Sequence, residues 1–452
     1  MSSTPLNVVY VHCHDAGRYV QPYGYAVSTP NLQRLAEEGV LFRQAFCMGP
    51  TCSPSRAALL TGQAPHAAGM HGVTNPNLGG FALHDCRQHL VHTLREAGYE
   101  STLCGFQHVA ADPEEIGYDR VIPMPTARRY NARTVAPKAA AFLQESPAEP
   151  FFLSVGTSEP HSIMGGNDPA WFTPDPENSD GRYARPPAIL PDTPATRHQM
   201  ADYCRAAAEY DYSLGTVLDA LDASGLAERT LVIATTDHGI DFPGMKCHLT
   251  DHGLGVLLVC RGPRSTGFDG GRVLDGLASH VDIFPTLCDL LDIDPPSWLQ
   301  GVSLMPMVRG ETVCVREEVH GEITYHGVYE PTRCVRTERW KYICRFDDLL
   351  PPHSAEGGAW PRTNPFERPL PNTGPGVSRD VLAEYGLGDR LPAGEELFDL
   401  VMDPMERVNL ATDPAYDRVL THMRARLQRW MSESGDPLAA GTAPGTGPHV
   451  TP

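Results

Sequence analysis

Residues 7–13 read NVVYVHC, and His14 and Asp15 follow them directly. An unbroken run of β-branched and apolar residues is the pattern of a strand that is buried on both faces. Such strands occur in mostly parallel sheets that helices cover on both sides. The polar pair at the end of the run therefore indicates functional side chains beyond the carboxyl end of this strand.

The first 310 residues repeat this arrangement of apolar strands and amphipathic helices. We predict further strands at 101–106, 150–156, 230–239 and 256–260, and helices at 29–39, 198–223 and 279–293. This alternation predicts an α/β fold, in which helices sandwich a large, mixed but mostly parallel sheet. Three of the strands run into polar residues, which are HD at 14–15, EPH at 159–161 and DHG at 237–239. Because the carboxyl ends of parallel strands meet at one edge, these residues predict a single site.

The pattern changes near residue 311. We predict an α/β domain over 1–310 and a smaller C-terminal α+β domain over 311–435, with a Pro-rich irregular insert at 351–376. The tail 436–452 is rich in Pro, Gly and Thr, a composition that predicts disorder.

Charge and composition exclude several classes of partner. The 452 residues carry a formal net charge of −19, which repels nucleic acid and anionic membranes, so an anionic substrate must be captured by a local basic cluster. No apolar run of about 18 residues, the length that spans a membrane, is present. The start, MSSTPLNVVYVHC, lacks the basic region of a signal peptide, and the twelve cysteines lack short paired spacings. We therefore expect a cytoplasmic protein with mostly free thiols.

The segment TCSPSRAALLTG, residues 51–62, places a cysteine at the start of a helix. Pro54 suits the first turn, so Cys52 lies close to the helix N-terminus, where free backbone N–H groups favour an anion. Arg56, on the first turn, can direct a forked pair of donors at an oxyanion. The alternative interpretation is that Cys52 is a small buried apolar residue.

At these residues the chain resembles the sulfatase family, whose motif Cys-x-Pro-Ser-Arg with Thr-Gly downstream appears here as CSPSRAALLTG. Within the family, the segments 150–161, 189–197 and 230–243 are most similar to the N-sulfatases (sulfamidases). The resemblance implies that a formylglycine-generating enzyme converts Cys52 to formylglycine. One hydroxyl of the hydrated aldehyde then attacks the sulfur of a sulfate ester, and the other expels sulfate by re-forming the aldehyde.

The resemblance also implies one divalent metal ion, usually calcium, bound by His14, Asp15, Asp237, His238 and the group derived from Cys52. The family usually has aspartate at the position of His14 and asparagine at that of His238. Calcium prefers oxygen ligands, whereas imidazole suits manganese or zinc, so the metal identity stays open. Alternatively, His14 is a strand-end histidine that bonds the backbone.

Three further residues match family positions that contact the sulfate group or the leaving oxygen. His108 and His161 match the two histidines, which can move protons near neutral pH, and Lys246 matches a basic residue that contacts sulfate. The alternatives are two loop histidines without a function and an ordinary surface lysine.

The segment GFQH, residues 105–108, departs from the family's Gly-Lys-x-His. Phe106 replaces the lysine, so one sulfate-binding cation is missing. Gln107 can supply a neutral hydrogen bond, and Lys246 or Arg182 can supply charge. This loss also favours the interpretation that the chain is a non-catalytic anion-binding descendant.

Substrate specificity is predicted to come from the smaller domain, where Glu322 can pair with an amino sugar and Arg333 with a carboxylate. A solvated charged strand is the alternative. The predicted function is hydrolysis of a sulfate ester or sulfamate on a small, anionic sugar substrate. The alternatives are a phosphonate or phosphate mono- or diester hydrolase, which the histidines at 14 and 238 favour, and the non-catalytic descendant.

Overall fold

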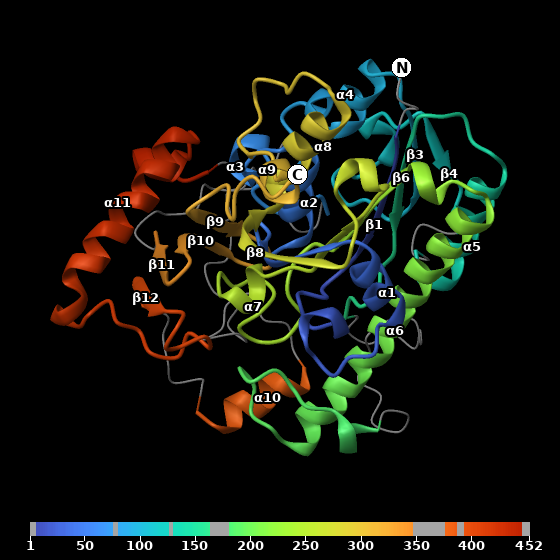
Figure 1. Ribbon diagram of the computed structural model, residues 1–452. Coiled ribbons are helices and arrows are strands. Elements are labelled where there is room, and N and C mark those ends of the chain that lie inside the picture. The colour runs from blue at the N-terminus through green and yellow to red at the C-terminus, as the bar shows by residue number, and fades with distance from the viewer. Residues whose placement is uncertain are drawn as a thin grey trace.

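The computed structural model describes residues 6–75, 80–125, 130–162, 180–346, 376–386 and 393–444. Its centre is an eight-stranded sheet with the order β4-β3-β5-β1-β6-β7-β2-β8 (Figure 1). The strands are β1 (Asn7–Cys13), β2 (Val40–Phe46), β3 (Glu100–Gly105), β4 (Arg120–Ile122), β5 (Phe151–Gly156), β6 (Thr230–Thr236), β7 (Leu258–Arg261) and β8 (Arg272–Ser279).

The sheet is mostly parallel, as the apolar runs predict. β1 lies between β5 and β6 and pairs in parallel with both, and every residue of β1 is buried. β7 is the exception, because it runs antiparallel to both β6 and β2. Because β7 runs antiparallel to both of its neighbours, β2 has the same direction as β6, and it pairs in parallel with β8. The carboxyl ends of β1, β6 and β2 therefore lie at the same edge of the sheet.

Helices cover both faces of the sheet (Figure 1). On one face, α1, α5 and α6 pack in a single apolar core with β1, β5 and β6. On the other, α2, α4 and α8 pack in a second core with β2 and β7. The helices are α1 (Pro30–Glu38), α2 (Cys52–Thr61), α3 (Pro65–Ala68), α4 (Leu90–Glu96), α5 (Ala132–Gln144), α6 (Pro194–Ala223), α7 (Asp251–Leu254), α8 (Ile283–Leu291), α9 (Met305–Val308), α10 (Val377–Glu384) and α11 (Asp417–Glu433). None of these helices is long and apolar enough to cross a membrane within the described ranges.

A second, antiparallel sheet has the strand order β12-β11-β10-β9. Its strands are β9 (Glu318–Tyr325), β10 (Tyr329–Thr337), β11 (Trp340–Arg345) and β12 (Glu395–Asp399), and α11 packs on it through a separate apolar core. Such a sheet with a helix matches the smaller α+β region, while the boundary near residue 310 stays a prediction. Most of the predicted Pro-rich insert lies outside the described residues.

The predicted disordered tail is ordered over its first part. Residues Pro437–Ala440 form a 3-10 helix, Asp436 is buried, and the Tyr325 hydroxyl donates a hydrogen bond of 2.8 Å to the carbonyl of Pro444. The prediction of disorder is therefore wrong for residues 436–444. The buried Arg333 pairs with Asp436 and so holds this segment in place, and a Pro/Gly-rich composition does not reveal such a contact. Residues 445–452 lie outside the described part.

Candidate active site

Two polar pairs meet beyond the ends of β1 and β6. Cys13 and Thr236 are aligned in the register of these parallel strands, so the residues that follow them become neighbours. The backbone N–H of Asp15 donates to Asp237 Oδ1 at 2.9 Å. Asp15 has a φ of 51°, a left-handed conformation that aspartate tolerates better than most residues. The two carboxylates are thereby joined at one point of the sheet edge.

The N-terminus of α2 brings Cys52 to these carboxylates. Cys52 Sγ lies 3.5 Å from His238 Nε2, and the thiol is buried. The Ser55 hydroxyl donates to the carbonyl of Asp237 at 2.5 Å. The serine of the motif therefore fixes the helix against the end of β6. Burial raises the pKa of the Cys52 thiol far above its usual range, so the unmodified side chain is an uncharged thiol.

Arg56 is buried beneath the site and bonds to protein groups. Its Nη2 donates to Asp237 Oδ2 at 3.0 Å and to the Cys13 carbonyl at 2.8 Å, and its Nη1 lies 2.5 Å from His12 Nδ1. The guanidinium is thus occupied by protein groups, and its predicted contact with an oxyanion stays a prediction. In this arrangement it positions Asp237, because a buried charge needs a buried partner.

We call His14, Asp15, Cys52, Asp237 and His238 the strand-end cluster. One ligand atom from each of the first four lies within 4.8 Å of the others. Both ring nitrogens of His14 and Asp15 Oδ1 are buried without a hydrogen bond, although His14 Nδ1 lies 3.0 Å from Asp237 Oδ2. Buried polar atoms without partners are costly, and a cation would satisfy Asp15 Oδ1 and the one ring nitrogen of the neutral His14 that has a lone pair. The residues present therefore fit a divalent metal ion.

The protonation states of the cluster also suit metal binding. Burial, together with the Arg56 guanidinium, lowers the pKa of His14 to about 3, so its imidazole is neutral. Burial works against ionisation of Asp237, but the neighbouring imidazole of His238 and the guanidinium of Arg56 hold its pKa well below the usual range. His238 Nδ1 lies 3.0 Å from the Gly239 carbonyl, an acceptor, and this contact orients the ring so that Nε2 faces the cluster.

Lys246 and His161 converge on the same oxygen of Asp15. Lys246 Nζ lies 2.9 Å from Asp15 Oδ2, and His161 Nδ1 lies 3.1 Å from it. Burial opposes the charge on Lys246, but Asp15 raises the pKa of its ammonium well above the usual range. The structure therefore brings both residues to the site, with a fixed positive charge at its rim.

His108 also lies close to the cluster. Its ring centroid is 6.3 Å from that of His14, and burial together with His14 holds its pKa well below the usual range. Phe106 lies between these rings, with its centroid 4.3 Å from that of His14 and 5.3 Å from the Arg56 guanidinium carbon. Phe106 thus fills the position of the missing lysine with an aromatic ring.

Gln107 and Arg182 are both bonded to other groups. The Gln107 amide bonds its own loop, because it donates to the Ala110 carbonyl at 2.6 Å and accepts from the N–H groups of Val109 and Ala110. Arg182 is paired with Asp180 at 2.7 Å, in a largely exposed position. Because nearer partners occupy both side chains, the hydrogen bond from Gln107 to the anion and the charge from Arg182 gain no support here and stay predictions.

Glu322 and Arg333 are not in the strand-end cluster. They face one another across β9 and β10, with Arg333 fully buried. Glu322 accepts from the His66 N–H at 2.7 Å and contacts the His66 ring, while Arg333 Nε donates to Asp436 Oδ2 at 2.5 Å. We call His66, Glu322, Arg333 and Asp436 the seam cluster. Both side chains are thus paired within this cluster, and the substrate contacts of Glu322 and Arg333 stay a prediction.

Two residues near the site escaped the sequence analysis. A carboxylate oxygen of Asp241 lies within 4.8 Å of ligand atoms of Asp15 and His161, and 4.0 Å from Lys246 Nζ. Burial, with Lys246 and His238 nearby, lowers the pKa of His326 to about 3, which indicates that the turn after β9 reaches this site. The position of Asp241, four residues after Asp237 in one loop, was a usable signal.

Comparisons with known proteins agree with this geometry. The family model described as Sulfatase matches residues 6–293. The human protein N-sulphoglucosamine sulphohydrolase is 29% identical over 467 residues, which cover 96% of this chain and 91% of the relative. The solved structure of a 2-O GAG sulfatase superposes with a TM-score of 0.70 at 23% identity, covering 97% of this chain and 94% of the other. The phosphonate monoester hydrolase of Agrobacterium radiobacter superposes with a TM-score of 0.66 at 22% identity, covering 95% and 96%.

Proposed function

The chain belongs to the sulfatase family, and we propose that it hydrolyses a sulfate ester or a sulfamate on a small saccharide. The observation that carries the proposal is the position of Cys52. It lies at a buried helix N-terminus, with its Sγ 3.5 Å from His238 Nε2, beside the His14 imidazole and an Asp15 oxygen that lack hydrogen-bond partners. The saccharide is suggested by the name of the human relative, which acts on N-sulphoglucosamine.

Sulfatases use a metal ion and a formylglycine formed from this cysteine, and the strand-end cluster fits both groups. His14, Asp15, Asp237 and His238 would hold the metal, which would neutralise charge on the sulfate group and orient it. Formylglycine at position 52 would supply the nucleophilic oxygen, and a formylglycine-generating enzyme would be a required partner of the newly made chain.

The remaining residues bind the anion and supply a proton to the leaving group. The Lys246 ammonium, held 2.9 Å from Asp15, is a cation for the sulfate group. His161 is oriented through its Nδ1, which lies 3.1 Å from Asp15 Oδ2. Its side chain is 28% exposed, so its Nε2 is suited to give a proton to the leaving oxygen or nitrogen. Arg56 would position Asp237, to which its Nη2 donates at 3.0 Å.

We expect manganese or zinc, rather than the calcium that is usual in the family, at this site. Two of its four ligands are imidazoles, and such nitrogen ligands suit manganese or zinc better than calcium. Elemental analysis of the protein after dialysis against a mixture of the three ions tests this preference independently of activity. Retention of calcium alone would contradict it.

The test of the main proposal combines one mass measurement with a substrate panel. The tryptic peptide that contains Cys52 should lose sulfur and two hydrogens and gain one oxygen when the chain is made together with a formylglycine-generating enzyme. The modified protein should hydrolyse N-sulphoglucosamine or a sugar sulfate ester, and Cys52→Ala should abolish that activity. Full activity with an unmodified thiol would overturn the mechanism.

A phosphonate or phosphate ester hydrolase is the second candidate. The imidazole ligands His14 and His238 favour it, whereas the likeness to the Agrobacterium enzyme supports the fold alone. The same panel separates the candidates when it includes phosphonate and phosphate mono- and diesters. Turnover of these esters without sugar sulfates would replace the main proposal, and binding without any turnover would indicate a non-catalytic descendant.

A further inference from the structure

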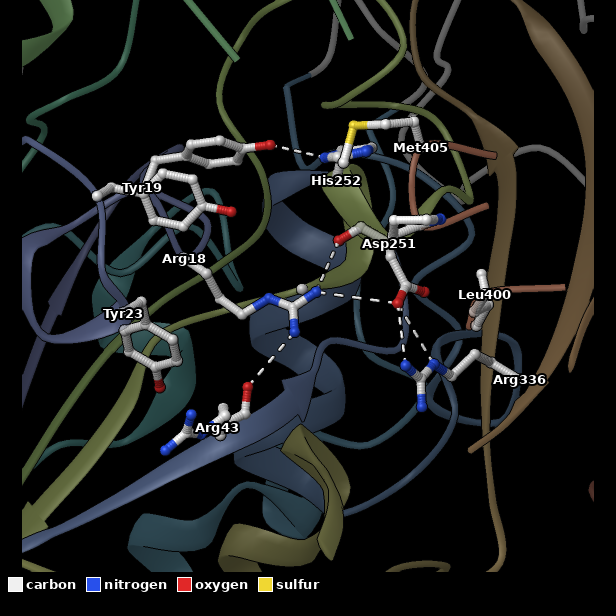
Figure 2. A pocket seen from close by; sticks show the side chains of 12 residues that line it. Arg18, Tyr19, Tyr23, Arg43, Asp251, His252, Arg336, Leu400 and Met405 are labelled. Carbon is white, nitrogen blue, oxygen red and sulfur yellow. Dashed lines mark hydrogen bonds and ion pairs between the residues drawn. The ribbon is translucent and has the colours of Figure 1, made fainter. Parts of the chain in front are cut away.

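A separate pocket lies beside the strand-end cluster and shares no residue with it (Figure 2). Its volume is about 290 Å³, and it is lined by the segment that follows Asp15, by β2, by α7 and by residues of the smaller region. Figure 2 shows the Arg18 side chain reaching from the N-terminal segment across the pocket towards Asp251 and Arg336. Asp15 and Arg18 are three residues apart, so the two sites share one loop.

The pocket has more cations than its single lining carboxylate can neutralise. Asp251 Oδ2 lies 3.2 Å from Arg336 Nη2 and 3.9 Å from Arg18 Nη2, and Asp251 Oδ1 lies 3.0 Å from Lys341 Nζ. Glu406, the other acid in contact with Lys341, is buried, and this burial raises its pKa to about 7. The three cations are therefore neutralised by the full negative charge of Asp251 and only part of a charge on Glu406.

Arg18 is the least satisfied of these cations. Its hydrogen bonds to the Arg43 carbonyl at 3.4 Å and the Asp251 carbonyl at 3.3 Å are longer than ordinary N–H···O bonds. The fold nevertheless makes room for this side chain, because a Cβ on Gly255 would lie 2.4 Å from the guanidinium. The Phe46 ring, 5.0 Å away, supports it as well. The guanidinium is thus held in place with donors to spare.

Aromatic rings form the opposite wall. Tyr19 and Tyr25 lie with ring centroids 4.4 Å apart, and Tyr25 is 42% exposed. Leu400 and Met405 add apolar surface on the side of the smaller region. Pockets that combine flat apolar walls with a few fixed polar groups suit a small ring that carries a charge.

We propose that this pocket is a second, non-catalytic binding site for a carboxylate or sulfate group carried on a single sugar ring. The guanidiniums of Arg18 and Arg336 receive the anion, and the tyrosine wall receives the ring. The choice of a sugar rests on the proposed function, whereas the anion site itself does not.

Calorimetric titration of the full chain with glucuronate tests the site, with glucose as the neutral ring and inorganic sulfate as the free anion. Glucuronate should bind more tightly than either. Arg18→Gln should weaken glucuronate binding by about tenfold or more, the usual effect of losing a charge-assisted hydrogen bond. Tyr25→Ala, a surface change, should weaken it several-fold and serves if Arg18→Gln does not fold.

The matched controls are Arg264→Gln and Tyr385→Ala, whose side chains are exposed and lie outside the pocket. Both should bind glucuronate as the parent does, and so should Lys246→Gln. Unchanged affinity in both pocket variants would overturn the proposal, and loss of binding in Lys246→Gln would place the sugar in the strand-end cluster instead. Since glucuronate carries no sulfate, these outcomes are independent of whether the chain hydrolyses sugar sulfates.

Discussion

The strand-end cluster and the seam cluster are built from the same kinds of residue but differ in how fully they are satisfied. Both are buried, both combine histidine with carboxylates, and both contain three or more groups within reach of a single metal ion. In the seam cluster, the Arg333 guanidinium takes the place that a metal ion would have, with its Nε 2.5 Å from Asp436 and 3.7 Å from Glu322. In the strand-end cluster, His14 and one oxygen of Asp15 keep unused lone pairs.

This difference separates a structural site from a functional one. Burial of a polar atom without a hydrogen-bond partner destabilises the fold. Groups that stay unsatisfied in an otherwise well-bonded interior indicate a missing ligand. Residue type and burial alone would have assigned the same role to both clusters.

The largest expected effect comes from removing a carboxylate of the strand-end cluster. Asp237→Asn should lower kcat/KM by about a thousandfold or more, since metal-assisted charge stabilisation supplies several kcal/mol. Metal content, measured by elemental analysis, should fall with it. Asp436→Asn is the matched change in the seam cluster and should keep the metal. Equal metal loss in both variants would remove the distinction between the clusters.

The next effect concerns stability and should appear only in the seam cluster. Arg333→Met leaves Glu322 and Asp436 without their buried cation, which typically costs about 3–5 kcal/mol. Urea denaturation should report this loss, while the activity of each folded molecule is kept. Arg264→Met, at an exposed arginine, is the control and should change stability little. An Arg333→Met protein as stable as the parent would show that the seam cluster does not hold the fold together.

A smaller effect follows from adding a charge to the unsatisfied cluster. Phe106→Lys should strengthen inhibition by sulfate about tenfold, the value of one charge-assisted hydrogen bond. The gain is limited because the new ammonium would lie near the Arg56 guanidinium, which is 5.3 Å from the present ring. Phe106→Met, which removes the ring without adding charge, is the control. Unchanged inhibition would mean that Lys246 already fills the vacancy.

The smallest effect is the pH dependence of the seam cluster. Burial works against a charge on His66, but Glu322 raises the pKa of its imidazole above the usual range, and Glu322 itself has its pKa lowered to about 2. The raised histidine contributes stability below pH 6.5 that is lost as the pH rises through its folded value. The lowered glutamate contributes stability above pH 4.5 that is lost as the pH falls towards 2.

The unfolding midpoints of the parent and of His66→Gln should therefore differ most between about pH 4.5 and pH 6.5, where both contributions are present. The two midpoints should converge at lower and at higher pH. The difference should be on the order of 1 kcal/mol, the net value of one hydrogen bond. A constant difference from pH 4 to pH 9 would mean that His66 does not titrate with folding.

The sequence could predict the sheet and the strand-end cluster because both depend on local signals. The apolar run of β1 ends in its own functional pair, and the motif at Cys52 starts its own helix. The partners of Glu322 and Arg333 could not be predicted, for a different reason. Arg333 has its partner 103 residues away, and Glu322 bonds His66 across 256 residues, so no local pattern reports that these charges are already paired.

The same separation in sequence determines when, during translation, the contacts of the seam cluster can form. The ring of His66, five residues after the end of α2, contacts Ser434, which is made 368 residues later. At roughly 5–20 residues per second, synthesis of that length takes on the order of 20–70 seconds. During this interval the seam cannot close over the segment that carries Cys52. Any enzyme that modifies this thiol, which is enclosed in the finished protein, therefore has its best access while the chain is still being translated.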